Sequence, residues 1–508
     1  MSLIWAQKSL AGLSIGQYKR CPTMTPDFPF WAGAFAAQMH RLRTTTGSGL
    51  HQFELLFGHW IGRFRLAQQD EGVHSRDRLW NLRLVFWTFL WQVAQVGSSC
   101  REAIRQAQSL CQLNGRAFPP DQSSPYCQAR GKLPIERLQQ IHTSLVSEAE
   151  QGVGAKELWC GHRVRAVDGT TVTMADTPDN QKAYPQLKCQ KPGCGFPILR
   201  LLAFFSLATG MLTTWVTGPW LQSEAALLQA LWLELRAGDV LLGDRGFSRW
   251  AVLAECVVRG IHGVFRLHGS RRCDFRRGRR LSKHQRLVRW AKPRTQAASL
   301  TPEQWARLPE YLDLRLVRCR MALPGFRTRE VILVTTLLDN LKYPAQALGK
   351  LYLRRWDMEL TLRHLKTTLQ MEHLSCKNPD NIERELRMHL LVHNLGRRLM
   401  LEAARRARVP LDRVSFAGAL ALARRYGEAL LQARHQRKRR QLIQELYRVL
   451  ASDLVPDRPA RRQPRAIKRR PKPFALLTKH RSRFLEVPHK SHYWERRRFK
   501  KCAQKSSR

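Results

Sequence analysis

The sequence predicts an α/β protein whose mixed core is flanked by helical regions on both sides. Residues 163–267 read as strand, strand, strand, helix, strand, helix, strand. Residues 30–112 place apolar and basic residues at helical spacing, and helical spacing returns over residues 381–450. With 508 residues, 44% of them hydrophobic, the chain is long and apolar enough for two or three folded domains.

Charge is the strongest compositional signal. The chain has 87 Lys and Arg against 39 Asp and Glu, a formal net charge of +48. Such an imbalance repels itself within a folded protein and indicates a polyanionic partner that neutralises it. Nucleic acid is the favoured partner, and an anionic membrane surface is the rival. The apolar fraction excludes an intrinsically disordered protein.

The two longest apolar stretches disfavour a membrane-spanning protein. Residues 82–96 are too short to cross a bilayer, and Arg83 and Gln92 interrupt them. Residues 198–221 are long enough, but the Ala-Thr-Gly sequence within them favours two strands joined by a tight turn. Because the N-terminus has no signal pattern, we expect a cytoplasmic, nucleoid-associated protein.

The N-terminal region, residues 1–150, is predicted to be helical and to bind DNA, the latter on its charge alone. Within it, residues 79–96 predict a buried helix. The segment 98–102 predicts the cap of the next helix. Residues 113–131 contain several Gly and Pro and are predicted to be a loop.

The core begins with three predicted strands. Residues 163–172 are rich in Val and Thr, and residues 198–208 form a near-continuous apolar run typical of a buried strand. Residues 211–216 predict the third strand. Ser223 then predicts the cap of a helix that extends to Arg236.

The rest of the core continues the alternation of strand and helix. A short buried strand at 240–242 runs into Gly243 and Asp244, and a helix at 248–258 and a strand at 263–267 follow. The core is predicted to end at residue 402.

An insertion and two C-terminal segments complete the predicted organisation. Residues 269–340 are predicted to be a partly β insertion, with strands at 312–321 and 330–337. Residues 403–454 are predicted to be helical. The tail, residues 455–508, has 19 Lys and Arg against 3 Asp and Glu, and its prolines predict a disordered arm that binds DNA through charge.

Two aspartates interrupt apolar strands of the predicted core. Asp168 lies in the sequence AVDGT, and Asp244 lies in LLGDRGF at the end of the next buried strand. A carboxylate in such a position has few partners unless a cation binds it. The ordinary alternative is a turn, since Asp-Gly and Gly-Asp are common turn dipeptides.

Residues 351–369 predict an amphipathic helix with an unusual polar face. Within an arc of about 60°, this face carries one carboxylate, one phenol and two cations, namely Glu359, Tyr352, Arg355 and Lys366. Arg363 lies beside them on the same helical wheel. The ordinary alternative is a solvated face whose ion pairs contribute tenths of a kcal/mol.

Together, Asp168, Asp244 and Glu359 provide the hard oxygen ligands that Mg²⁺ or Mn²⁺ prefers. Two such ions about 3.5–4 Å apart can activate a hydroxyl and stabilise the leaving oxygen of a phosphodiester. The neighbouring cations and the phenol would then hold DNA phosphates.

The order of these motifs resembles the DDE transposases of bacterial insertion sequences, in the insertion-sequence-four type family defined by a Tyr-Arg-Glu-Lys signature. The resemblance rests on DGT, then GDRGF, then Tyr, Arg, Glu and Lys separated by two, three and six residues. It also includes the loops at 183–186 and 190–197 and the run ILVTTLLD. It is strongest over residues 160–400.

The resemblance implies a ribonuclease-H-like catalytic core over residues 160–402, interrupted by the β-rich insertion at 269–340. It implies that the catalytic and metal-binding residues are Asp168, Asp244 and Glu359. It also implies that Tyr352, Arg355 and Lys366 contact the transposon-end backbone. Some relatives carry a base-stacking Trp where this chain has Val331, and Trp305 is the substitute candidate.

By function, the resemblance implies a transposase that binds the ends of its insertion sequence, hydrolyses DNA phosphodiesters and transfers the 3′-OH ends to target DNA. Pairing of two ends implies a homodimer. Two alternatives use the same features: a ribonuclease-H-like nuclease or resolvase, and a catalytically inactive DNA-binding protein.

Four residues offer a less favoured metal site. Cys160, His162, Cys189 and Cys194 would suit a structural zinc, but only one tight Cys pair is present. Ordinary reduced thiols are the favoured interpretation of these cysteines.

Overall fold

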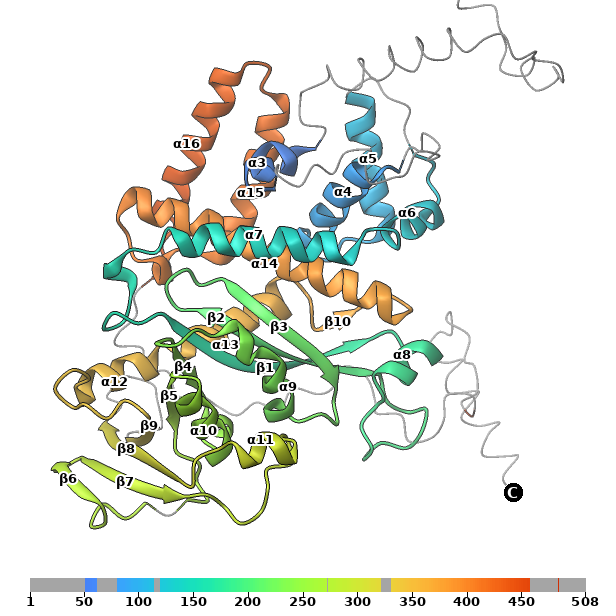
Figure 1. Cartoon of the computed structure of the whole chain (residues 1–508). Coiled ribbons are helices and arrows are strands. Elements are labelled where there is room, and N and C mark those ends of the chain that lie inside the picture. The colour runs from blue at the N-terminus through green and yellow to red at the C-terminus, as the bar shows by residue number, and fades with distance from the viewer. Residues whose placement is uncertain are drawn as a thin grey trace, which may run out of the picture. The chain divides into compact units, whose positions relative to one another are not determined.

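One mixed β-sheet organises the computed structural model of the chain (Figure 1). Within the described residues, its ten strands are β1 (Val164–Met174), β2 (Ile198–Ser206), β3 (Leu212–Pro219), β4 (Val240–Gly243), β5 (His262–Arg266), β6 (Arg279–Ser282), β7 (Gln285–Ala291), β8 (Tyr311–Arg320), β9 (Glu330–Thr335) and β10 (His373–Leu374). Their order in space is β3-β2-β1-β4-β5-β9-β8-β7-β6, and β10 pairs with β1.

The structure describes residues 51–61, 80–113, 119–271, 273–320, 330–456 and 483. All of them belong to one of the two compact units of the chain, Leu50–Arg508. The predictions for residues 1–50 and, apart from residues 455, 456 and 483, for the basic tail lie outside the described residues.

The first three strands form an antiparallel meander, as predicted. β1 pairs with β2 and β2 with β3, and Gly210, at φ +67°, lies in the turn between the last two strands. A positive φ is a conformation that glycine adopts at little cost. The apolar stretch at 198–221 is therefore two strands. Among the described residues, no helix is both long enough and apolar enough to cross a membrane.

Helices cover both faces of the sheet (Figure 1). On one face lie α9 (Glu224–Leu231) and α10 (Trp250–Val258), and on the other lie α7 (Ile135–Gln151) and α14 (Pro379–Ala407). Successive residues of β2 belong to two different buried apolar clusters, one on each face. Burial on both faces explains the near-continuous apolar sequence of this strand.

The helices before and after the core pack together. α3 contacts α15, and α14 contacts α4, α7 and α16. The bounds of those not yet given are α3 (Gln52–Ile61), α4 (Leu82–Ala94), α5 (Cys100–Leu113), α6 (Ser123–Arg130), α15 (Phe416–Gln432) and α16 (Gln436–Ser452). The predicted boundary at 402/403 falls inside α14, because this helix is buried along most of its length and continues without a break.

Two local predictions for the N-terminal region had different outcomes. The cap before α5 is confirmed, because the Ser99 hydroxyl accepts a hydrogen bond from the Glu102 N–H at 3.2 Å. The loop predicted at 113–131 is wrong in part, because α6 lies within it. Tyr126 anchors α6: its ring is buried, and its hydroxyl donates to Gln92 at 2.8 Å.

The helix predicted to run from Ser223 to Arg236 begins as expected and ends early. The Ser223 hydroxyl accepts a hydrogen bond from the Ala226 N–H at 3.2 Å. The α-helix ends at Leu231, and a 3₁₀ turn, Trp232–Glu234, follows.

The insertion predicted at 269–340 extends the core sheet. β9 pairs antiparallel with β5, and β8 and β7 continue outward from it. The apolar residues of β8 that face α10 join the same buried cluster as that helix. Two short helices, α8 (Pro178–Ala183) and α11 (Pro302–Ala306), lie in the connections.

The single helix predicted at 351–369 is wrong. The segment consists of α12 (Ala345–Leu353), α13 (Trp356–Arg363) and a π-helical turn (His364–Thr368). At the first junction, the Arg354 N–H bonds to the Leu351 carbonyl and the Arg355 N–H to the Tyr352 carbonyl, which is tighter than α-helical bonding. Residues on the two sides of each junction therefore do not share the helical face that a continuous wheel assigns to them.

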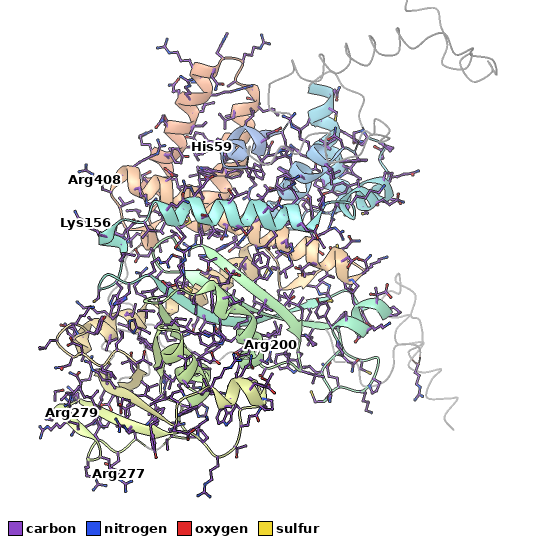
Figure 2. All side chains as sticks on the ribbon, in the orientation of Figure 1. His59, Lys156, Arg200, Arg277, Arg279 and Arg408 are labelled. Carbon is purple, nitrogen blue, oxygen red and sulfur yellow. The ribbon has the colours of Figure 1, made fainter. Side chains whose placement is uncertain are left out.

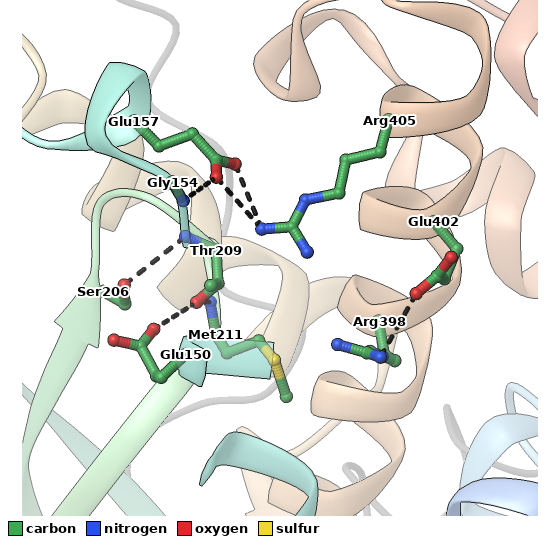
Figure 3. A network of polar contacts seen from close by, with 9 residues as sticks. All are labelled: Glu150, Gly154, Glu157, Ser206, Thr209, Met211, Arg398, Glu402 and Arg405. Carbon is green, nitrogen blue, oxygen red and sulfur yellow. Dashed lines mark hydrogen bonds and ion pairs between the residues drawn. The ribbon is translucent and has the colours of Figure 1, made fainter. Parts of the chain in front are cut away.

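A buried ion pair joins α7 to the first strand. An Arg165 nitrogen lies 2.7 Å from Glu150 Oε2, and both side chains are largely buried. The same carboxylate accepts a hydrogen bond from the Thr209 hydroxyl at 2.9 Å, as Figure 3 shows. Although burial opposes it, the charge of Arg165 and these hydrogen bonds lower the pKa of Glu150. Glu150 therefore connects α7, β1 and the turn before β3.

We predict that Glu150→Gln destabilises the protein, because it leaves the buried Arg165 guanidinium without a counter-charge. Breaking such a pair lowers the free energy of unfolding by about 3 kcal/mol. Chemical denaturation measures the difference. The matched control is Glu136→Gln, an exposed residue of the same helix, which should change stability by less than about 0.5 kcal/mol. Equal stability of the two variants would contradict this role.

Candidate active site

Two carboxylates lie side by side where β1 pairs with β4. The strands are parallel, with Ala166 opposite Leu242. Asp168 and Asp244 are each two residues further along, so they lie at the same level and on the same face of the sheet. Since β4 ends at Gly243, the sheet opens beside Asp168.

Backbone N–H groups hold both carboxylates in place. Gly169 donates to Asp168 Oδ1 at 2.9 Å, and Gly246 donates to Asp244 Oδ1 at 2.7 Å. The second contact caps the short 3₁₀ turn that follows β4. Asp244 therefore does stabilise a turn, as the alternative interpretation predicted. Only its Oδ1 atom accepts the Gly246 hydrogen bond, so Oδ2 could still bind a metal ion.

The environment of Asp168 disfavours its charged form. Burial raises the pKa of Asp168 from 3.8 to about 6, and the charges of Asp244 and Glu224 act in the same direction. The Gly169 hydrogen bond and the Arg355 charge oppose the shift without cancelling it. A cation bound near Asp168 would therefore stabilise its charged form.

Glu359 lies in the first turn of α13 and is exposed. Arg355 Nη2 donates to Glu359 Oε1 at 2.9 Å, so the predicted carboxylate and cation do meet. The charges of Glu359 and Asp168 both raise the pKa of Arg355 against its burial. Arg355 therefore interacts with both Glu359 and Asp168.

Tyr352 is buried beside Arg355 at the end of α12. The Arg355 guanidinium lies 5.8 Å from the Tyr352 ring and 5.0 Å from the Trp356 ring. Burial raises the pKa of the Tyr352 phenol. Arg355 Nε is buried and has no hydrogen-bond partner among the described residues. The break between α12 and α13 thus places this arginine in an aromatic cradle with one donor unused.

The two remaining predicted cations lie beyond Glu359. Lys366 belongs to the π-helical turn, so it does not have the position that a continuous α-helix would give it. Its Nζ lies 3.7 Å from Glu372 Oε1. Arg363 is exposed and lines a cavity of about 900 Å³ together with Arg397 and Arg408. Lys156 and Arg408, both labelled in Figure 2, line the same cavity.

Sequence reasoning missed Glu224, whose charge acts on Asp168. It is the first residue of α9 and lies about 55 residues after Asp168 in the chain. Only the predicted cap at Ser223 could have drawn attention to it. The sequence contains no signal that this helix begins beside the first aspartate.

The donor set at this site fits a divalent cation in part. Asp168 and Asp244 offer hard oxygen ligands at one level of the sheet, and the half-buried Asp168 lacks sufficient counter-charge. Within the described ranges, no three His, Cys, Asp or Glu side chains are arranged to hold a metal ion together. Glu359 is paired with Arg355 instead. Release of Glu359 from Arg355 would free both of its carboxylate oxygens for a metal ion.

The other predicted sites have different surroundings. Both ring nitrogens of His162 are bonded, one to the Gly238 carbonyl and one to the Tyr343 hydroxyl, each at 2.7 Å, so neither is free for a metal. Trp305 packs against Trp250 at 5.5 Å within an apolar cluster, and Val331 is buried in β9. Val331 is therefore not available for base stacking, whereas Trp305 is only half-buried.

Comparisons with known proteins found three similarities. The family model described as Transposase DDE domain matches residues 159–395. The chain is 26% identical over 414 residues to the transposase InsG for insertion sequence element IS4 of Escherichia coli strain K12, covering 80% of this chain and 89% of that protein. It also aligns with a piggyBac transposase in a synaptic complex with hairpin DNA, at a TM-score of 0.40 and 10% identity, over 78% of this chain and 84% of that one.

The matched region contains the paired aspartates and the Arg355–Glu359 pair in the order that the motifs predicted. The relative extends the similarity over most of the chain. Residues 159–395 therefore match a DDE transposase domain, and over most of its length the chain is similar to a transposase of the insertion-sequence-four type.

Proposed function

We propose that Asp168, Asp244 and Glu359 are the catalytic carboxylates of this transposase. The observation that supports the proposal best is the parallel pairing of β1 with β4, which sets the two aspartates at one level. Arg355 links them electrostatically to Glu359. The three carboxylates come from two adjacent strands and a helix at the open end of β4.

DDE transposases use divalent metal ions. In our proposal, Asp168, Asp244 and Glu359 hold Mg²⁺ or Mn²⁺, two ions in the active complex. When bound, such ions activate a water or hydroxyl nucleophile and stabilise the leaving oxygen of the phosphodiester. The raised pKa of Asp168 supports this assignment, because a cation offsets the cost of its buried charge.

DNA phosphates are proposed to compete with Glu359 for Arg355. The buried Arg355 Nε has no hydrogen-bond partner among the described residues, and a phosphate can accept two parallel hydrogen bonds from an arginine. A phosphate bound there would release the Glu359 carboxylate toward the aspartates. Tyr352, Lys366 and Arg363 are the further proposed DNA contacts, of which Lys366 would have to leave Glu372.

The reaction proposed for this site is hydrolysis of a phosphodiester at each end of the insertion sequence, followed by transfer of the 3′-OH to target DNA. Double-stranded DNA is thus both substrate and target. Pairing of two ends is expected to require a homodimer. The protein side chains supply position and charge, while the metal ions activate the reacting oxygens.

The proposed architecture is a ribonuclease-H-like core. The spatial order β3-β2-β1-β4-β5, with the first three strands antiparallel and the next two parallel to β1, supports it. Residues 160–402 would form the catalytic domain, and residues 269–340 the β-rich insertion. The N-terminal helices up to residue 150 are proposed to bind DNA, as is the basic tail, in the cytoplasm at the nucleoid.

We predict that Glu359→Gln abolishes cleavage of DNA carrying the element's ends in Mg²⁺ and retains binding of that DNA. The amide keeps the shape but is a poor metal ligand. Gel-based cleavage and binding assays separate the two effects. The control Asp380→Asn changes an exposed acid at the start of α14 and should keep both activities. Full cleavage by Glu359→Gln would remove Glu359 from the site.

We also predict that, without divalent metal ions, Asp168→Asn stabilises the protein above pH 6. The folded protein keeps the Asp168 proton up to about pH 6, whereas the unfolded chain releases it near 3.8. Between these values the folded state binds more protons, so wild-type stability falls as pH rises. At pH 8 the variant should gain at most about 3 kcal/mol.

Below pH 3.8, where Asp168 is protonated in both states, this gain should vanish. Thermal unfolding in EDTA at several pH values measures the difference between the two proteins. A difference that stays the same across the pH range would contradict the assigned environment of Asp168.

A further inference from the structure

A fourth carboxylate lies beside the Asp168 backbone. Glu224 begins α9, the helix that Ser223 caps and that packs against β2 and β3. If Gly169 carried a Cβ atom, it would lie 2.6 Å from Glu224 Oε1 and 3.0 Å from its Cδ. The Glu224 carboxylate therefore lies directly over the residue that donates a hydrogen bond to Asp168, and only a glycine leaves it room.

Glu224 approaches β1 from the face opposite the aspartate side chains. Successive residues of a strand point to opposite faces, so the Gly169 position faces α9 while Asp168 faces away from it. Asp168 and Gly169 lie beyond Val164–Ala166, the residues of β1 that pair with β4. The charges interact: Glu224 acts on Asp168, and Asp244 acts on Glu224.

Arg200, one of two cations near Glu224, is engaged elsewhere. The Arg200 guanidinium stacks 4.3 Å from the Trp220 ring and donates to the Gln222 carbonyl at 2.9 Å (Arg200 is labelled in Figure 2). Arg200 and Arg249 oppose the effect of burial, which raises the pKa of Glu224, but neither forms an ion pair with it among the described residues. The Glu224 charge therefore adds to the negative potential at the aspartates.

We propose that Glu224 is a positioning residue of the transposase active site, which increases its affinity for divalent cations from the α9 face of β1 and fixes the Asp168–Gly169 backbone. The proposal rests on the function proposed above for Asp168 and Asp244. Glu224 acts through the electrostatic field and through Gly169, without binding the metal ion itself. Outer carboxylates that support metal ligands change metal affinity by about 10- to 100-fold.

Glu224→Gln removes the charge and keeps the shape, and it should weaken Mn²⁺ binding to the DNA-free protein about tenfold. Isothermal titration calorimetry and Mn²⁺ electron paramagnetic resonance measure this affinity without any cleavage. The Mg²⁺ concentration for half-maximal cleavage should rise by a similar factor, while kcat at saturating Mg²⁺ stays within about twofold. Glu224→Asp retains the charge and should restore most of the affinity. In EDTA, Glu224→Gln should bind end DNA at least as tightly as the wild type, because the variant has lost a negative charge that repels DNA.

The matched control is Glu234→Gln, an exposed acid three residues beyond α9 that carries the same change of charge. It should leave Mn²⁺ affinity unchanged. Gly169→Ala provides an independent variant: its methyl group displaces the Glu224 carboxylate, so it should weaken Mn²⁺ binding in the same direction even if Glu224→Gln does not fold.

Two results separate this proposal from the proposed function. If Asp168→Asn abolishes Mn²⁺ binding and Glu224→Gln leaves it intact, the role of Glu224 is overturned and the site stands. If Mn²⁺ binding survives Asp168→Asn and Asp244→Asn, the proposed metal site itself is overturned. An equal loss of affinity in Glu224→Gln and Glu234→Gln would also overturn the role of Glu224, because the effect would then be one of net charge.

Discussion

The parallel pairing of β1 with β4 is the constraint on which the rest of the site depends. This register brings Asp168 and Asp244 to the same level of a sheet that helices cover on both faces. Two acids in a half-buried position repel each other, and burial raises the pKa of Asp168 further. The chain has a net charge of +48, yet Arg355, whose charge acts on Asp168, is bonded to Glu359. The site therefore retains negative charge that a metal ion can neutralise.

Arg355 connects this charge to the residues that we propose contact DNA. It donates a hydrogen bond to Glu359, packs beside the Tyr352 ring, and its charge lowers the pKa of Asp168. The tight turn between α12 and α13 is what makes this position available, because a continuous helix would place Arg355 differently relative to the aromatic rings. If a phosphate binds Arg355, the carboxylate that Arg355 holds becomes free. Substrate binding and completion of the metal site would then be one event.

Much of the core could be predicted from the sequence, because its signals are local. The apolar run of β2, the cap at Ser223 and the aspartate after β4 each follow from a few neighbouring residues. The assignment of the aspartates to one site came from the order of the motifs, and the structure adds their register.

Other features depend on contacts between distant residues and could not be predicted. The helix α6 is stabilised by Tyr126 buried against α4, and β9 joins the core sheet through β5, although the chain between them reads as an insertion. The break after α12 and the approach of Glu224 to Gly169 follow from packing against the sheet. A helical wheel cannot show either of them, since it assumes a continuous helix and no neighbours.

The most direct test of the account is a structure of the protein bound to DNA carrying its element's ends, with Mn²⁺ located by its anomalous scattering. The account predicts Mn²⁺ bound to carboxylate oxygens of Asp168 and Asp244 at about 2.1 Å, with Glu359 detached from Arg355 and Arg355 bonded to a phosphate. Mn²⁺ bound elsewhere, or Glu359 still paired with Arg355 beside an occupied metal site, would contradict it.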